Sequence, residues 1–225
     1  MRKRLITIVG ILLSGLVLAQ NTDVREITPF DKIKVSGEVK VYVEKGDRES
    51  VTVKTNEIPT SDIISEIKNK TLEIRLKKNL YKNVKAEVYV TYRELRDIHV
   101  SGAAYVSVND TLMVDKLTLT VKTSSEFDGT LMANTADLRV TQASTARLRG
   151  KVNNYEAQAS TGGILAALEL QSDSTFVKVS SGATAKVYAS ELLDAKIQTG
   201  GSLVHTGGAK QKNVKSFLGS KVYEQ

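Results

Sequence analysis

The chain of 225 residues contains no cysteine and no tryptophan, and it has only two prolines. Without cysteine it can form no disulfide, and it offers neither a thiolate nucleophile nor a thiolate metal ligand. Aromatic residues are also scarce, with four Phe and eight Tyr. Stability must therefore come from burial of Val, Leu, Ile and Ala and from backbone hydrogen bonds, which suits a thin and elongated core better than a large globular one.

The N-terminal segment is typical of a secretory signal peptide. Three basic residues at positions 2–4 precede a largely apolar run from Leu5 to Leu18, and Ala19 provides a small residue for cleavage. The run is shorter than the roughly 20 residues that a helix needs to span a bilayer. We therefore predict that residues 1–19 are removed and that the protein is exported, to the periplasm, the outer surface or the medium, with no transmembrane segment in the mature chain.

The positive charge of the chain is small once that segment is removed. The formal net charge of +7 comes from 32 Lys and Arg against 25 Asp and Glu. Residues 1–19 hold three of these bases and no acid, which leaves 29 against 25 and a net charge of +4. The remaining bases alternate with apolar residues, as on the solvated face of a sheet, so we expect no nucleic-acid partner.

Residues 20–94 are predicted to form a β-rich N-terminal unit, because apolar residues alternate with polar ones at the period of half-buried strands. The alternating positions include Ile33, Val35, Val39, Val41, Val43, Val51, Val53, Leu72, Ile74, Leu76, Ala86, Val88 and Val90. One short helix is expected over Thr60–Lys68, with Ser61 and Asp62 as candidate caps and three isoleucines on one apolar face.

From residue 95 to residue 225 the sequence repeats with a period of about 19 residues. Two-residue corners of small character recur at Ser101-Gly102, Thr123-Ser124, Gln142-Ala143, Ser160-Thr161, Ser181-Gly182, Thr199-Gly200 and Leu218-Gly219. A unit this short cannot bury its apolar side alone, so we expect coils stacked about 4.8 Å apart. Gly, Ser or Thr would then reverse the chain at each corner, and the inward residue there should be small.

These patterns predict an all-β protein. The repeats of residues 95–225 would form a right-handed parallel β-helix-like solenoid, packed with the N-terminal unit of residues 20–94 as one elongated domain. An antiparallel sandwich with Gly and Ser turns is the alternative, but the even spacing of the corners favours the solenoid.

A series of short motifs runs through the chain in a fixed order. The motifs are F-x-x-I-x-V-x-G at Phe30–Gly37, V-Y-V at Val41–Val43, L-E-I at Leu72–Ile74 and L-x-x-I-x-V-S-G at Leu95–Gly102, followed by the serial corners. Over roughly Ile27–Val222 the sequence thereby resembles the head GIN domain family, named for auto-transporter adhesins and common among exported proteins of Bacteroidetes. The resemblance implies a right-handed β-helical fold and no established enzymatic activity, cofactor or ligand residue.

One group of residues invites a catalytic interpretation. Asp97, His99 and Ser101 share one face of a strand, because side chains at i, i+2 and i+4 point the same way. A nucleophilic triad instead needs groups that converge from different directions beside an oxyanion hole. We therefore expect a solvated outer face at these three residues.

Two carboxylate pairs could suggest a polysaccharide-cleaving enzyme, Glu126 with Asp128 and Asp110 with Asp115. Both lie at expected turns, and we expect no aromatic residue near them on which a sugar ring could stack. The paired glycines are no better candidates. Gly162-Gly163 and Gly207-Gly208 lack the Asp that a calcium-binding solenoid requires, and Gly200-Gly201 does not match a phosphate loop. No catalytic residue, cofactor-binding residue or metal ligand is therefore assigned.

Two functions remain open. The favoured hypothesis is a non-enzymatic interaction module of the cell envelope or the medium, adhesin-like, whose partner is an envelope polysaccharide, an envelope protein or a second copy of itself. The alternative is a β-helical protein that binds or cleaves envelope polysaccharide, with carboxylates supplied by adjacent coils.

Overall fold

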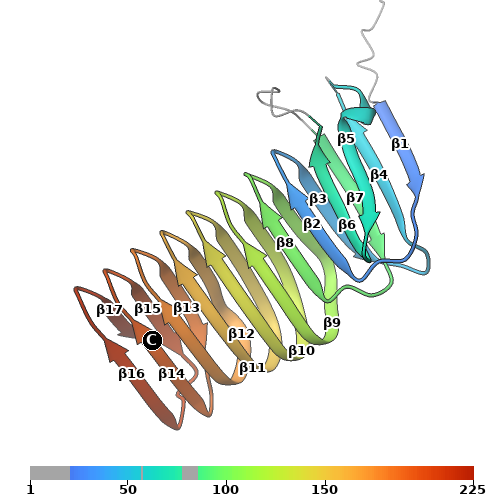
Figure 1. Cartoon of the computed structure of the whole chain (residues 1–225). Helices are drawn as coiled ribbons and strands as arrows, with labels where there is room; N and C mark the ends of the chain where they lie inside the picture. The colour runs from blue at the N-terminus through green and yellow to red at the C-terminus, as the bar shows by residue number, and fades with distance from the viewer. Residues whose placement is uncertain (1–20, 57, 78–85) are drawn as a thin grey trace, which may run out of the picture.

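The computed structural model describes residues 21–56, 58–77 and 86–225, so the predicted signal peptide lies outside the described residues. About 70% of the described residues lie in β-strands, and all 17 strands belong to one continuous sheet. This sheet winds into a parallel β-solenoid, which confirms the predicted all-β solenoid fold (Figure 1). Nowhere in the described residues is there a helix that is both long enough and apolar enough to cross a membrane.

Two layers of this continuous sheet face each other across the core of the solenoid. They are called the post-corner and the pre-corner sheet, because their strands follow or precede the corner of each coil. The strands of the stacked coils are β2 (Lys32–Ser36), β3 (Lys40–Lys45), β8 (Asp97–Ser101), β9 (Tyr105–Val121), β10 (Glu126–Thr141), β11 (Thr145–Ser160), β12 (Ile164–Val179), β13 (Thr184–Tyr188), β14 (Leu192–Ile197), β15 (Ser202–Thr206), β16 (Gln211–Ser216) and β17 (Lys221–Glu224). The post-corner sheet contains β3, the first halves of β9 to β12, β13, β15 and β17, all in parallel register. The pre-corner sheet contains β2, β8, the second halves of β9 to β12, β14 and β16.

Each coil reverses at a corner of two residues whose backbone is left-handed. The corners are Gly102-Ala103, Thr123-Ser124, Gln142-Ala143, Thr161-Gly162, Ser181-Gly182, Thr199-Gly200 and Leu218-Gly219, with φ between 50° and 72°. Five of the seven lie where the sequence predicts them, and two lie one residue later. Ser101 and Ser160 instead end their strands, where the Ser101 hydroxyl donates to the Val35 carbonyl at 3.3 Å.

A ladder of backbone hydrogen bonds joins the corners along the solenoid. The N–H of the second corner residue donates to the carbonyl of the first corner residue in the next coil; Ala143, for example, donates to Thr161 at 3.0 Å. Six such bonds of 2.9–3.1 Å connect the seven corners. The left-handed conformation costs a non-glycine residue roughly 1–2 kcal/mol, and this ladder helps to offset that cost because it gives an acceptor to the N–H of the second residue at each of the first six corners.

The residue after each corner is always small, and after the first six corners it is buried in the core. These residues are Ala104, Ser125, Ser144, Gly163, Ala183, Gly201 and Ser220. A Cβ atom on Gly163 would lie 2.4 Å from the carbonyl oxygen of Val140. The predicted requirement for a small inward residue is therefore confirmed, although it applies to the third residue of the corner and not to the first two.

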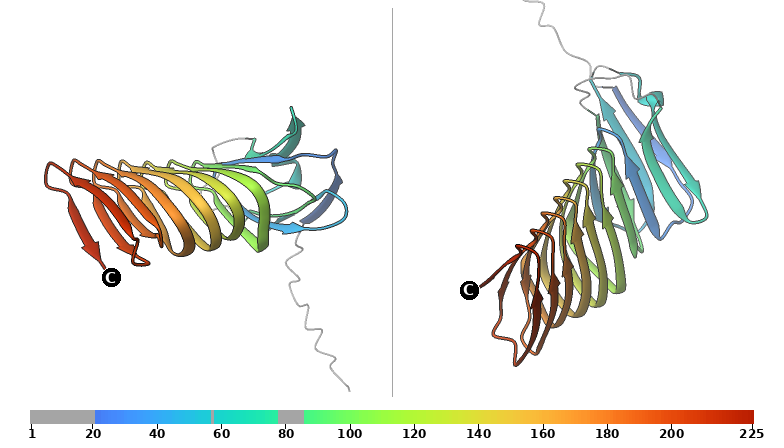
Figure 2. Two further views of the ribbon diagram at one scale, coloured as in Figure 1. Left: turned by 90° about the horizontal axis from the view of Figure 1, so that it is seen from below. Right: turned by 60° about the vertical axis from the view of Figure 1, so that its left-hand side comes forward.

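Antiparallel strands close the N-terminal end of the solenoid (Figures 1 and 2). They are β1 (Asn21–Glu26), β4 (Ser50–Thr55) and β5 (Ile63–Lys68), stacked on the parallel strands β6 (Thr71–Leu76) and β7 (Ala86–Tyr92). Arg25 of β1 joins the edges of the two sheets, because its guanidinium donates to the carbonyl of Ile63 at 2.7 Å and to the hydroxyl of Ser65 at 2.8 Å.

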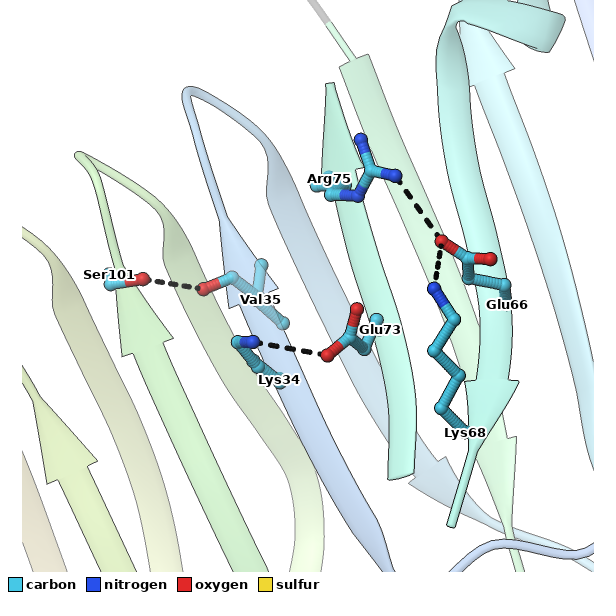
Figure 3. Close-up of polar contacts among 7 residues, drawn as sticks. All are labelled: Lys34, Val35, Glu66, Lys68, Glu73, Arg75 and Ser101. Atoms are coloured by element: carbon cyan, nitrogen blue, oxygen red, sulfur yellow. Dashed lines mark hydrogen bonds and ion pairs between the residues drawn. The ribbon is translucent and has the colours of Figure 1, made fainter. Parts of the chain in front are cut away.

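Exposed ion pairs cross the outer face of the pre-corner sheet at this end. Lys34 of β2 pairs with Glu73 of β6 at 3.0 Å, and Arg75 of β6 pairs with Glu66 of β5 at 3.2 Å (Figure 3). Exposed pairs of this kind contribute little to stability, but they show that the outer face is charged and solvated.

The helix predicted over Thr60–Lys68 is wrong. Only Thr60–Asp62 forms a short 3-10 turn, and β5 begins at Ile63. Asn69 and Lys70, both with positive φ, make a two-residue hairpin turn that pairs β5 with β6. The β-branched isoleucines favour a strand. Pairing with the free edge of β6 stabilises this strand more than the weak helical pattern of the segment stabilises a helix.

The last coil turns two charged side chains toward the core. Register places Lys212 of β16 beside Leu193 and Glu224 of β17 beside His205, both of which are buried in the preceding coil. The Lys212 ammonium pairs with the Glu224 carboxylate across the end of the core. Inward-pointing charges at an open edge oppose edge-to-edge association, so this ion pair protects the C-terminal end of the solenoid.

The small inward column predicts a sharp difference between two glycines. Gly163→Ala should destabilise the protein by about 1–3 kcal/mol, because the added methyl group collides with backbone. The control, Gly182→Asn at a corner with nothing within 4 Å of its Cβ position, meets no atom and should cost less than about 1 kcal/mol, because Asn tolerates left-handed backbone better than other non-glycine residues. Urea unfolding followed by circular dichroism measures both, and equal effects would refute the role of the inward column.

The inward ion pair yields a second prediction. Replacing Lys212 and Glu224 together by Leu removes both inward charges and should shift the protein toward dimers or larger assemblies in size-exclusion chromatography with light scattering. The matched control replaces Lys215 and Glu191, which are exposed, by Leu and should leave the assembly state of the wild type unchanged. If both double variants behave alike, the ion pair does not protect this end.

Candidate binding surface

The three residues considered as a triad lie along the outer side of β8 and do not converge. The Ser101 hydroxyl donates a hydrogen bond to the Val35 carbonyl of the neighbouring strand (Figure 3). Burial, followed by the charge of Lys122, lowers the pKa of His99. No hydrogen bond between described residues joins Asp97, His99 and Ser101, so they form no nucleophilic constellation.

The first carboxylate pair is held in ion pairs on the outer side of the post-corner sheet. The Glu126 carboxylate pairs with Arg147 of the next coil at 2.9 Å. Asp128 accepts two hydrogen bonds from the Arg149 guanidinium, at 2.8 and 3.3 Å. A general acid needs a carboxyl group that an apolar pocket keeps protonated, and neither of these groups has such surroundings.

The second carboxylate pair supports the bend between the sheets. Asp110 accepts hydrogen bonds from the Lys45 backbone N–H at 2.6 Å and from the Tyr92 hydroxyl at 3.2 Å. Asp115 accepts one from the Asn134 amide at 2.6 Å. Both acids therefore have structural partners at the bend.

The glycine pairs singled out in the sequence are structural as well. Gly162 and Gly200 are second corner residues, and Gly163 and Gly201 follow them in the inward column. Across the described part of the chain, no cluster of three or more His, Asp or Glu side chains could hold a metal ion.

Three tyrosines from three different strands meet on the outer side of the post-corner sheet. Tyr42 of β3 is the register partner of Tyr89 of β7, and their rings stack with centroids 5.3 Å apart and planes at 26°. Tyr105 of β9 meets Tyr42 edge-on at 6.4 Å and 67°. The Lys54 ammonium of β4 lies 4.4 Å from the centroid of the Tyr89 ring. These four residues are called the tyrosine face.

The tyrosine face combines aromatic surface with hydrogen-bonding groups. The Tyr89 hydroxyl donates to Glu87 at 3.0 Å, and this hydrogen bond is the first cause of the raised pKa of Tyr89. Burial, then the charge of Glu87, raises the pKa of Tyr42. Both phenols therefore stay neutral at physiological pH. The Tyr89 hydroxyl proton is taken by Glu87, so Tyr89 offers its ring and a hydroxyl acceptor, whereas Tyr42 can also donate a hydrogen bond. Half-buried tyrosines on rigid strands offer amphipathic contact area at a low cost in conformational entropy.

Sequence analysis missed this cluster, although it contained part of the signal. Tyr42 and Tyr89 each stand between two buried valines, which is enough to place them on an outer face. The parallel pairing of β3 with β7 joins segments more than forty residues apart and leaves no local trace. The expectation that no aromatic residue lies near Glu126 and Asp128 is wrong, because Tyr105 is the register partner of Glu126 on the neighbouring coil.

Comparisons with known proteins agree with this architecture. A solved structure named a "putative adhesin" from Bacteroides fragilis matches with a TM-score of 0.86 and 17% identity, over 92% of this chain and 97% of that chain. Another "putative adhesin", from Parabacteroides distasonis, matches with a TM-score of 0.75 and 20% identity, over 92% and 97%. A "putative lipid binding protein" from the same species matches with a TM-score of 0.65 and 15% identity, over 91% and 97%.

At such identities the likeness to these structures concerns the fold alone. No curated protein matches the sequence. The family described as "Putative auto-transporter adhesin, head GIN domain" matches residues 29–209. That match covers most of the chain, and the protein therefore belongs to the head GIN domain family.

Proposed function

We propose that the protein is a non-enzymatic, exported interaction module of the cell envelope that binds polysaccharide through the tyrosine face. The tyrosine face itself, with three rings gathered from β3, β7 and β9, is the observation that carries the proposal. Membership of an adhesin family supports a binding role, and the signal-peptide pattern of residues 1–19 supports export.

The form of the surface favours a polymer over a small molecule. The tyrosine face lies on the open side of a sheet, where outward side chains recur at the strand spacing of about 4.8 Å. A polymer of repeated units can contact such a surface at several points at once, so that individually weak contacts add up. Tyr, moreover, is enriched at the sites that contribute most to binding in protein interfaces.

Binding without cleavage fits the placement of the acids. Hydrolysis of a glycosidic bond needs two carboxyl groups flanking one bond, one of them held protonated. Glu126 and Asp128 each pair with an arginine, and Asp110 and Asp115 each hold the bend between the sheets. The candidate carboxylates are thus engaged with partners of the solenoid itself, which supports a protein that binds polysaccharide and leaves it intact.

The proposal predicts the effect of removing two rings. In the double variant Tyr42→Ala with Tyr89→Ala, affinity for a bound polysaccharide should fall about tenfold or more, since an aromatic contact contributes about 1 kcal/mol and 1.4 kcal/mol is a factor of ten. A glycan array identifies the polysaccharide, and isothermal titration calorimetry measures the affinity.

The matched control replaces Tyr188 and Tyr223 by Ala. Both are outward residues of the same sheet, on β13 and β17, away from the tyrosine face. This control should bind as the wild type does. If the wild type binds no glycan, or if the two double variants lose affinity equally, the tyrosine face is not the binding site. Capture of an envelope protein or a second copy instead would replace polysaccharide as the partner.

A further inference from the structure

A cleft of about 520 Å³ opens where the N-terminal strands meet the first long coil. One wall is the loop Arg93–Arg96, which joins β7 to β8. The other is the stretch Met113–Lys116 in the middle of β9, where that strand passes from one sheet to the other, and Lys45 stands at the end of β3. The side chain of Met113 is 61% exposed and gives the cleft an apolar wall.

Backbone and core contacts hold the walls in place. Leu95 is 1% exposed and anchors the loop in the core. The carbonyl of Arg96 accepts a hydrogen bond from the Thr118 N–H at 2.9 Å. The end of β3 is held by the Asp110 carboxylate, which accepts from the Lys45 N–H at 2.6 Å. The cleft is therefore formed before any ligand arrives, which lowers the entropic cost of binding.

Basic residues outnumber acidic ones in the lining of the cleft, and neither acid is in an ion pair with a described cation. Its cations are Lys45, Arg93, Arg96 and Lys116, and its acids are Glu94 and Asp115. Two of the cations already have carboxylate partners, Arg96 at 2.7 Å and Lys116 at 2.8 Å. No described carboxylate pairs with Lys45 or Arg93, so an ammonium and a guanidinium are both available to an anion. A guanidinium can donate two parallel hydrogen bonds to a carboxylate, sulfate or phosphate group.

The cleft lies at the far end of the strands that carry the tyrosine face. Tyr42 and Lys45 belong to β3, and Tyr89 and Tyr92 belong to β7. Three residues of extended strand span about 10 Å, which a polysaccharide can cover with a few sugar residues. Because side chains three residues apart on a strand lie on opposite faces, a glycan held by the rings would reach the cleft by passing around the strand ends.

We propose that this cleft binds the anionic group of an acidic polysaccharide, with Lys45 and Arg93 as the residues that select for negative charge. The inference rests on the proposed binding of polysaccharide at the tyrosine face and adds the class of polysaccharide to it. Carboxylated and sulfated glycans share the chemistry that these two residues recognise.

The test compares polymers that differ only in charge. Polygalacturonate and its fully methyl-esterified form share one backbone, and dextran sulfate and dextran form a second such pair. The full-length mature protein should bind the charged member of at least one pair at least tenfold more tightly in calorimetry. The pair that shows this preference tells whether carboxylate or sulfate is the group recognised, and affinity for the charged polymer should fall as salt is raised.

In the variant Lys45→Gln with Arg93→Gln, affinity for the charged polymer should fall about tenfold, while weak binding of the neutral polymer stays the same. The matched control is Lys151→Gln with Arg139→Gln, which removes one exposed Lys and one exposed Arg elsewhere and should retain the preference for charge. If the wild type has no such preference, or if both variants lose it equally, the cleft is not the anion site.

Failure of this inference is distinguishable from failure of the proposed function. If the Tyr42→Ala and Tyr89→Ala variant loses both polymers while Lys45→Gln with Arg93→Gln changes neither, the tyrosine face binds polysaccharide and only the cleft assignment is overturned. If the tyrosine variant binds both polymers as the wild type does, the proposed function itself fails. Circular dichroism and thermal melting of each variant confirm that the fold is intact.

Discussion

The hydrogen bond between successive corners is the interaction on which the rest of the structure depends. Two left-handed residues turn the chain, and the N–H of the second reaches the carbonyl of the first in the next coil. This bond can form only if every coil reverses at the same height, so it fixes the parallel register of both sheets. It also explains why Thr123-Ser124 and Gln142-Ala143 can serve without glycine, since the bonds help to offset the strain of a left-handed backbone.

Register in turn decides which side chains meet. Because side chains alternate along a strand, a fixed register stacks buried residues in columns and outward residues in rows. The core is only as thick as two facing sheets, and its inward residues shift from Val and Leu toward Ala in the later coils. Such a core is occupied by its own packed apolar side chains. Residues that bind a partner are therefore expected among the outward side chains. There Tyr42, Tyr89 and Tyr105 are neighbours although they are far apart in the sequence.

The local part of this architecture was predictable from sequence, and the non-local part was not. Evenly spaced Ser, Thr and Gly predict the corners. The alternation of apolar and polar residues along each strand predicts which side chains point inward. The isoleucines after Asp62 fit a helix as well as a strand, and only the free edge of β6 decides between them. The tyrosine face depends on the pairing of β7 with β3. Lys212 resembles any polar residue of an alternating strand until the register shows that it points inward.

The two ends of the solenoid explain why binding is expected on its sides. Arg25 and the antiparallel strands close one end, and the inward ion pair of Lys212 with Glu224 opposes edge-to-edge association at the other, where Phe217 and Leu218 are exposed. The outer faces of the two sheets repeat similar side chains from coil to coil. Such repetition adds weak contacts to a polymer together, but it distinguishes poorly between one polymer and another. Regularity breaks where the antiparallel strands join the coils, and the loop Arg93–Arg96 lies at that junction. The larger hollow at this junction, with Lys45 and Arg93 in its lining and unpaired among the described residues, departs from the regular faces, so we place selectivity at the junction and general adhesion on the sheet beside it.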